Sequence, residues 1–143
     1  TQFPNDELAK PFKVIHIDQH SDIKANVHPL PENKSSAAIF HFTNYECNVG
    51  NFITPALASG LIEECIQIRT ETALHTIQLD FEKYNYIVDI DIDFREKKSE
   101  EEIHTDYEIV KKLMNNACLI TIATSPFFID QKQAIRLTKK LFE

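Results

Sequence analysis

Residues 86–93, YIVDIDID, place three aspartates inside an apolar β-strand pattern. The period-two alternation predicts that Asp89, Asp91 and Asp93 share one face of this strand. Carboxylates within a strand are costly to bury unless a cation neutralises them. The stretch therefore predicts both a strand of the central sheet and a metal site at that strand.

A second polar segment follows the first predicted strand, residues 13–17. Residues 16–22, HIDQHSD, place Asp18, His20 and Asp22 two positions apart. This spacing predicts that the three side chains turn to one side. Mixed carboxylate and imidazole ligation favours manganese, iron or zinc, and a majority of carboxylates favours manganese. For this motif taken alone, a chance surface turn is an open alternative.

Strands and helices alternate along the chain. The patterns predict strands over residues 13–17, 37–42, 65–69, 76–81, 86–93 and 118–123, and helices over residues 51–60, from Ser99 to about 116, and after Asp130. This order favours an α/β fold, a three-layer sandwich in which helices cover a mainly parallel sheet. The continuous apolar run at 118–123 predicts a buried strand. Functional groups of such sheets gather beyond the carboxyl ends of the strands.

The composition limits the classes of partner. A chain of 143 residues is expected to form one domain over residues 1–143, and its net charge of -7 argues against nucleic acid as a partner. The same charge suits a cationic ligand or a bound metal. No apolar run has the length of a membrane span, and no signal-peptide pattern is present. Three unclustered cysteines predict a cytoplasmic location. Because no apolar run is long enough to span a membrane, we also expect no membrane partner.

Four motifs in order resemble one known superfamily. They are HIDQHSD (16–22), NVGNFI with PAL (48–53 and 55–57), DIDIDF (89–94) and TIATSPFFID (121–130). Together they resemble the arginase/deacetylase superfamily, and most closely the peptide arginases of ribosomal peptide biosynthesis. The resemblance covers most of residues 12–130. The chain is short for that fold, so some amino-terminal or loop segments are expected to be absent from it.

The resemblance implies a reaction and a ligand set. Members of that branch hydrolyse the guanidinium of arginine residues in a precursor peptide, leaving ornithine and releasing urea, and they use two Mn²⁺ ions. By analogy, Asp18 bridges the two ions, while His20 lies on one ion and Asp22 on the other. The superfamily pattern also includes an Asp-x-Asp pair among the metal ligands. We favour Asp91 as a second bridge and Asp93 as a terminal ligand.

Several assignments stay open at this point. Asp89 and Asp91 are the alternative ligand pair. If Asp91 and Asp93 are the ligands, Asp89 is expected to support a metal ligand without binding the metal itself. Arginase-type sites use a further histidine upstream of Asp18, and His16 is the candidate as an alternative ligand or supporting residue, although no motif identifies it. His41 is the candidate proton donor, with a packed strand histidine as its alternative.

Three residues between 46 and 51 are candidates for substrate binding. They are Glu46, Asn48 and Asn51, which flank Gly50 in a loop that leads into a predicted helix. Capping and turn chemistry explain the two asparagines equally well.

Two other functions compete with the peptide arginase. A zinc amidohydrolase of the deacetylase kind would use Asp18, His20 and one strand aspartate around a single ion. A metal-binding protein of the same fold without turnover is the third possibility.

Overall fold

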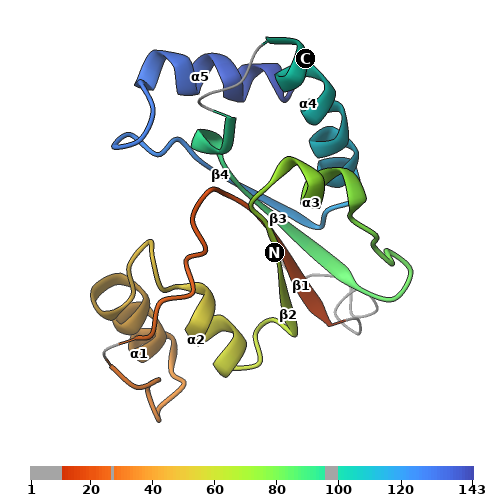
Figure 1. Ribbon diagram of the computed structural model, residues 1–143. Helices are drawn as coiled ribbons and strands as arrows, with labels where there is room; N and C mark the ends of the chain where they lie inside the picture. The colour runs from red at the N-terminus through yellow and green to blue at the C-terminus, as the bar shows by residue number, and fades with distance from the viewer. Residues whose placement is uncertain (1–10, 27, 96–99) are drawn as a thin grey trace.

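The computed structural model describes residues 11–26, 28–95 and 100–143, and its centre is a parallel β-sheet (Figure 1). Four strands pair in the order β2-β1-β3-β4, all parallel. In chain order they are β1 (Phe12–Ile17), β2 (Glu64–Ile68), β3 (Asn85–Asp91) and β4 (Leu119–Ala123). The predicted α/β class with a parallel sheet is confirmed.

Helices lie on both sides of this sheet (Figure 1). On one side are α1 and α2, and on the other α3, α4 and α5. The helices and helical turns are α1 (Ser36–His41), η2 (Phe42–Glu46, a π-helical turn), α2 (Ile53–Ala58), α3 (Glu71–Thr76), η3 (Ile92–Arg95, a 3₁₀ turn), α4 (Glu100–Asn115) and α5 (Gln131–Lys140). Among the described residues, no helix has the length and apolar character needed to cross a membrane.

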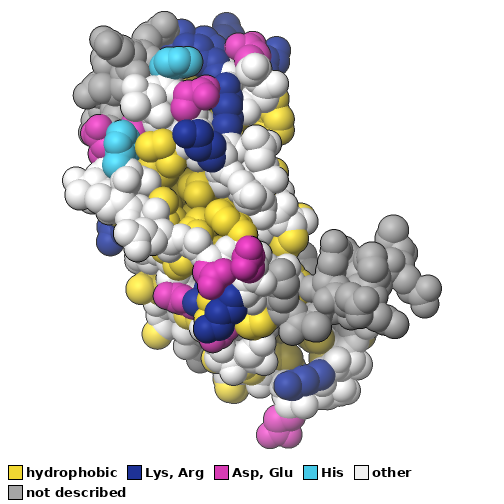
Figure 2. Space-filling view, turned by 90° about the vertical axis from the view of Figure 1, so that its right-hand side faces the viewer, with side chains coloured by type: hydrophobic (Ala, Val, Ile, Leu, Met, Phe, Trp, Pro, Cys, Tyr) yellow, Lys and Arg dark blue, Asp and Glu magenta, His cyan; other side chains and the backbone are white. Residues whose placement is uncertain are grey.

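Alternation along β1 and β3 divides the hydrophobic core between the two faces of the sheet. Ile15 and Val88 are fully buried and join Leu74 of α3 and Leu137 of α5 in the larger cluster. The smaller cluster, on the side of α2, contains Val14, Ile53 and Ile62. Figure 2 shows the side on which α3 and α4 lie, where hydrophobic side chains gather across the middle between charged groups.

Side-chain caps fix where several helices begin. The side-chain oxygens of Ser35, Thr70 and Asp130 accept backbone N–H groups in the first turns of α1, α3 and α5. Gly60, with φ of 71°, follows α2 and ends it in the left-handed conformation that glycine allows. A helix therefore lies within the predicted range 51–60, with Gly60 just beyond its end.

Two predicted strands are wrong. Residues 37–42 are helical, because Ser35 caps α1 and the chain continues as the turn η2. No residue of α1 is buried, and within this apolar run Phe42, the first residue of η2, is the buried side chain. Residues 76–81 contain the end of α3 and a loop, since the cap at Thr70 starts a helix there. Leu79 and Phe81 pack against the core without pairing in the sheet. Ser99 and residues 1–10 lie outside the described residues.

The predicted burial of 118–123 is also wrong. The strand forms, but β4 pairs only with β3 and lies at the edge of the described sheet. Leu119 is 52% exposed and Ile120 is 36% exposed. Sequence alone marked the strand as apolar and could not show its place in the sheet order.

We expect Leu137→Ala to lower the free energy of unfolding by about 2–5 kcal/mol, because the substitution leaves a cavity in the core. Leu137 is fully buried, whereas Ile135 on the same helix is 44% exposed. Ile135→Ala is therefore the matched control and should cost less than about 1 kcal/mol. Urea unfolding followed by circular dichroism measures both, and equal losses would contradict the packing of α5.

Candidate metal centre

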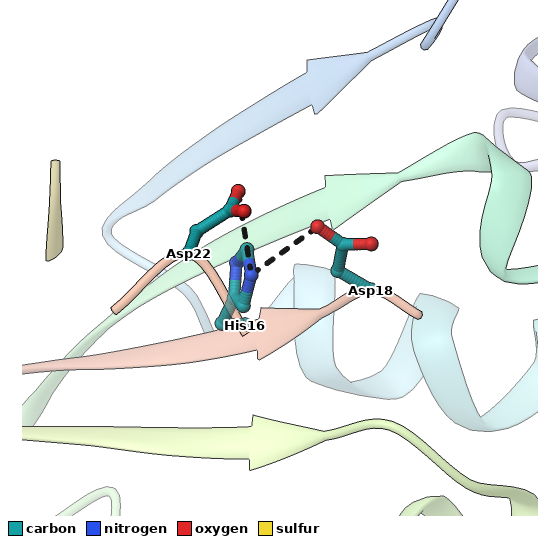
Figure 3. Close-up of side chains that lie close together, drawn as sticks. All are labelled: His16, Asp18 and Asp22. Atoms are coloured by element: carbon teal, nitrogen blue, oxygen red, sulfur yellow. Dashed lines mark ion pairs between the residues drawn. The ribbon is translucent and has the colours of Figure 1, made fainter. Parts of the chain in front are cut away.

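Two groups of possible metal ligands lie at the carboxyl ends of β1 and β3. The first contains His16, Asp18 and Asp22, and the second contains Asp18, His20 and Asp93. Within each group the ligand atoms lie within 4.8 Å of one another. Figure 3 shows the side chains of the first group, with the imidazole facing both carboxylates. Because Asp18 belongs to both groups, the two sites adjoin through one carboxylate.

The chain turns sharply after β1 and brings this set together. Asp18 continues the ladder by one bond, since its N–H donates to the carbonyl of Ile68 at 3.2 Å. Its Oδ1 then accepts the N–H of His20 at 2.7 Å, which closes a tight turn. Asp22 has φ of 50°, an unusual value for a residue with a side chain, and reaches back toward His16.

His16 is held as a metal-ligating histidine would be. Its Nδ1 lies 2.8 Å from Oδ2 of Asp89. Its Nε2 lies 3.4 Å from Asp18 Oδ2 and 3.9 Å from Asp22 Oδ2. This nitrogen is buried and makes no hydrogen bond to any described residue. An oriented imidazole with one nitrogen on a carboxylate and the other facing carboxylates fits a metal ligand.

The carboxylate behind His16 is itself anchored across the sheet. His16, Asp89 and Thr121 are register partners on the neighbouring strands β1, β3 and β4. The Thr121 hydroxyl donates to Asp89 Oδ1 at 2.5 Å, while Oδ2 faces the imidazole. Three adjacent strands therefore fix the orientation of the His16 ring.

The buried charges shift each other's protonation. Burial acts to lower the pKa of His16, but the close contact with Asp18, the hydrogen bond with Asp89 and the charges of both carboxylates outweigh it and raise the pKa to about 9. For Asp18, burial acts to raise the pKa, yet the close contact with His16 and the hydrogen bond from the His20 backbone bring it below its ordinary value. In the absence of metal, the positive charge of protonated His16 therefore compensates the neighbouring carboxylates.

Asp91 lies beside the two ligand groups but in neither of them. Its carboxylate accepts hydrogen bonds from the Ser125 hydroxyl and, at 3.4 Å, from the N–H of Asp93. Burial and the charge of Asp18 raise the pKa of Asp91. Burial and the same charge also raise the pKa of Asp22. Of the strand aspartates, the structure thus brings Asp93 into a ligand group, with Asp89 behind His16.

Two aromatic side chains flank the centre. The ring of Phe128 lies 4.6 Å from that of His20, and the ring of Phe52 lies 6.1 Å from that of His16, measured between centroids. Phe52 is 39% and Phe128 54% exposed, and the His20 side chain is 44% exposed. Asp18 and Asp93 are therefore buried, whereas His20 and the two aromatic rings are partly exposed to solvent.

The other predicted site residues lie elsewhere. His41 ends α1, is exposed, and packs its ring 5.0 Å from that of Tyr45. Glu46 pairs with His28 at 3.0 Å, and together with His41 these residues line a surface hollow of about 370 Å³. In Figure 1, α1 lies farther from the sheet than α2. The structure does not bring His41 or Glu46 into contact with the described ligand groups.

The two asparagines act in a turn. Asn51 Oδ1 accepts the N–H of Asn48 at 2.8 Å, and Asn48 Oδ1 accepts the N–H of Gly50 at 2.9 Å. The carbonyl of Gly50 accepts the N–H of Lys24 at 3.0 Å, so this turn holds the segment after Asp22. Turn chemistry, the alternative left open by the sequence, accounts for both side chains.

Several contributing residues carried no recognisable signal in the sequence. Gln19 donates to the carbonyl of Asp93 at 2.5 Å, and Arg69 donates twice to the carbonyl of Gln19, at 3.1 and 2.9 Å. These bonds join the turn after β1 to η3 and to the end of β2. Thr121 and the two flanking phenylalanines lie within motifs that the sequence analysis quoted, but their contacts with Asp89, His16 and His20 are visible only in the structure.

A third group of possible ligands lies away from this centre, between α3 and α4. It contains Glu71, His75 and Asp106, and His75 Nε2 lies 2.7 Å from Asp106 Oδ1. Asp106 is fully buried. This contact links the two helices, on the opposite face of the sheet from α2.

No family model matches this chain, and no curated protein or solved structure matches it. The function is therefore argued from the chemistry of the centre itself.

In protein kept free of metal by a chelator, the free energy of unfolding should fall as the pH rises from 6.5 to about 9. The pKa of His16 is raised from 6.5 to about 9 on folding, so the folded state binds more protons across this window. The stabilisation is complete below pH 6.5, is lost as the pH passes 9, and amounts to at most about 3 kcal/mol.

Urea unfolding at several pH values measures this slope. His16→Gln should flatten the slope, and the exposed His104→Gln should leave it unchanged. A wild-type slope that survives in His16→Gln would show that another group carries the proton.

Asp89→Asn should weaken binding of Mn²⁺ about 10–100-fold, because the substitution removes the charge that orients and activates His16. Titration calorimetry measures the affinity directly. Glu108→Gln is the matched control, since the Glu108 side chain is 52% exposed on α4. Unchanged affinity of Asp89→Asn for Mn²⁺ would show that Asp89 does not support His16 as a metal ligand.

Proposed function

We propose that this protein is a manganese-dependent hydrolase that converts arginine residues of a peptide to ornithine and releases urea. The observation that carries the proposal is the sharing of Asp18 by two groups of ligands. Two metal ions that share a carboxylate are the arrangement used to attack carbon centres that resist hydrolysis. The parallel sheet with helices on both sides is compatible with the arginase/deacetylase-like fold that the sequence motifs resemble.

The described residues divide between the two metal positions. His16 and Asp22 would hold one ion, His20 and Asp93 the other, and Asp18 would contact both. Manganese bound there would supply an activated water and stabilise the charge that develops on the substrate. The donor set fits Mn²⁺, because three carboxylates and two imidazoles form a hard, mixed oxygen and nitrogen environment.

The surroundings of the centre favour a cationic substrate. Asp22 has 18% of its side chain exposed and adds negative charge beside His16. Phe52 and Phe128 present partly exposed rings beside it. A guanidinium is planar and weakly hydrated, so carboxylates and aromatic faces together hold it better than they hold a neutral amide. The net charge of -7 attracts the same class of substrate over a longer range.

A zinc deacetylase-type reaction is the second candidate. The group of Asp18, His20 and Asp93 by itself supplies one imidazole and two carboxylates, the ligands of a single-ion site. The ligand group that contains His16 favours the two-ion reaction over the single-ion reaction, because a single ion at Asp18, His20 and Asp93 would leave the buried Nε2 of His16 without a metal. Two manganese ions per chain support the first reaction, one zinc ion supports the second, and metal uptake without product supports a binding protein.

Incubation of the manganese-loaded protein with arginine-rich peptides should produce ornithine and urea. Each converted arginine loses about 42 Da, which mass spectrometry detects as a ladder of products. The colorimetric assay for urea checks the second product independently.

His20→Ala should abolish both products, because it removes an imidazole from the ligand group that contains Asp93. His104→Ala, on an exposed position of α4, is the matched control and should retain activity. Unchanged peptides in the presence of two bound manganese ions would disprove the proposed reaction.

A further inference from the structure

The turn formed by residues 18–22 carries three of the candidate ligands and lies beside the carboxyl end of β2. No residue of β2 itself belongs to a described ligand group. Among the described residues, the last backbone hydrogen bond between the two segments runs from the N–H of Asp18 to the carbonyl of Ile68, at 3.2 Å. Contacts from side chains therefore decide where the rest of the turn lies.

Two side chains at the end of β2 bind backbone carbonyls of this turn. The amide of Gln67 donates to the carbonyl of Ser21 at 3.0 Å. The guanidinium of Arg69, the residue that follows β2, donates through Nε and Nη2 to the carbonyl of Gln19, at 3.1 and 2.9 Å. Hydrogen bonds from an ionised donor are stronger than neutral ones, and two bonds from one planar group fix direction as well as distance.

The contact of Arg69 leads to the ligand group of Asp18, His20 and Asp93. A peptide group is planar and rigid, so a bound Gln19 carbonyl also fixes the N–H of His20 on the other side of that peptide. This N–H donates to Asp18 Oδ1 at 2.7 Å. The Gln19 side chain in turn donates to the carbonyl of Asp93 at 2.5 Å. Arg69 is therefore connected through Gln19 to both His20 and Asp93.

The contact of Gln67 leads to the other ligand group, which contains His16 and Asp22. The Ser21 carbonyl that Gln67 binds belongs to the peptide group that carries the N–H of Asp22. The φ of 50° at Asp22 is sparsely populated and persists only where the surroundings fix it. Gln67 is also the register partner of His16 on β1. One position of β2 therefore lies beside both ligands, whose convergence Figure 3 shows.

We propose that Arg69 and Gln67 are positioning residues of the metal centre, each acting on one of its two ions. Arg69 places His20 and Asp93 for one ion, and Gln67 places Asp22 for the other. This inference rests on the proposed function, which assigns one ion to each ligand group. Neither side chain is itself a ligand, and both act through backbone carbonyls. The end of β2 thus sets the affinity of the two metal positions without supplying a ligand to either.

Variants that retain one metal position test the two assignments separately. His20→Ala removes an imidazole from one ligand group and leaves the group of His16 and Asp22. Asp22→Gly removes a carboxylate from the other group and leaves that of His20 and Asp93. Titration calorimetry with Mn²⁺ then measures the affinity of the remaining position alone, and this readout does not depend on activity.

The two positioning variants should have opposite effects in these backgrounds. In Asp22→Gly, the further change Arg69→Met should weaken binding of the remaining Mn²⁺ about 10–100-fold, whereas Gln67→Met should leave it nearly unchanged. In His20→Ala, Gln67→Met should cause the loss and Arg69→Met should not. Arg69 is exposed and Gln67 is only partly buried, so both variants should fold, which circular dichroism checks.

A control and a conservative variant separate positioning from general stability. Glu64→Gln lies at the opposite end of β2, where the Glu64 side chain is 51% exposed, and should leave both affinities unchanged. Arg69→Lys keeps the charge and one donor, so it should recover part of the affinity lost in Arg69→Met. Electron paramagnetic resonance should show two coupled Mn²⁺ ions in the loaded wild-type protein and uncoupled ions in Arg69→Met at limiting metal.

The outcomes distinguish the positioning roles from the proposed reaction. Selective loss of one ion in each variant, without ornithine from the wild type, would support the positioning roles and disprove the reaction. Ornithine formation with unchanged affinities in both variants would support the reaction and overturn the roles. Equal weakening of both ions by each variant, or Arg69→Lys as weak as Arg69→Met, would also overturn the roles. Fewer than two ions in the wild type would overturn both proposals.

Discussion

The structure depends on how negative charge is neutralised where β1 and β3 end side by side. Asp18 and Asp93 are each 1% exposed, although both are carboxylates. Burial of such groups is unfavourable unless a cation or several hydrogen bonds compensate it. Within the chain, the His16 imidazole, held from behind by Asp89, faces Asp18, and His20 Nδ1 lies 3.7 Å from Asp93 Oδ2. The same side chains are the ones that the proposed function assigns to the metal.

This constraint explains why the parallel order of the sheet matters to the chemistry. Since β1 and β3 are neighbours and run in the same direction, the residues that follow them meet at one edge. An antiparallel arrangement of the two strands would place Asp18 and Asp93 at opposite ends. Helices α3, α4 and α5 support this geometry on one face by filling the core around Ile15 and Val88, and α2 packs against Val14 on the other face.

Sequence alone predicted the parts of the centre whose signal is local. The spacing of Asp18, His20 and Asp22 predicted that their side chains turn to one side. The aspartates of residues 86–93 indicated a second acidic segment that could share a metal with them. The role of His16 depends on a residue 73 positions away, so only the register between β1 and β3 reveals it. The prediction of a strand at residues 37–42 is wrong because the Ser35 cap starts a helix there, and no residue of that helix is buried. The exposure of β4 depends on sheet order, which composition does not encode.

Backbone conformation limits which residues can replace two members of the centre. Asp22 and Ser125 are non-glycine residues with φ of 50° and 42°. Only glycine adopts this region freely, with asparagine and aspartate as the usual exceptions, and β-branched side chains are strongly disfavoured there. At position 22, glycine would adopt the positive φ without strain but would remove the carboxylate. Glutamate would keep the charge but lacks the tolerance of aspartate for positive φ. Aspartate is thus the one acidic residue that satisfies both requirements, and designers who vary this loop have almost no freedom at that position.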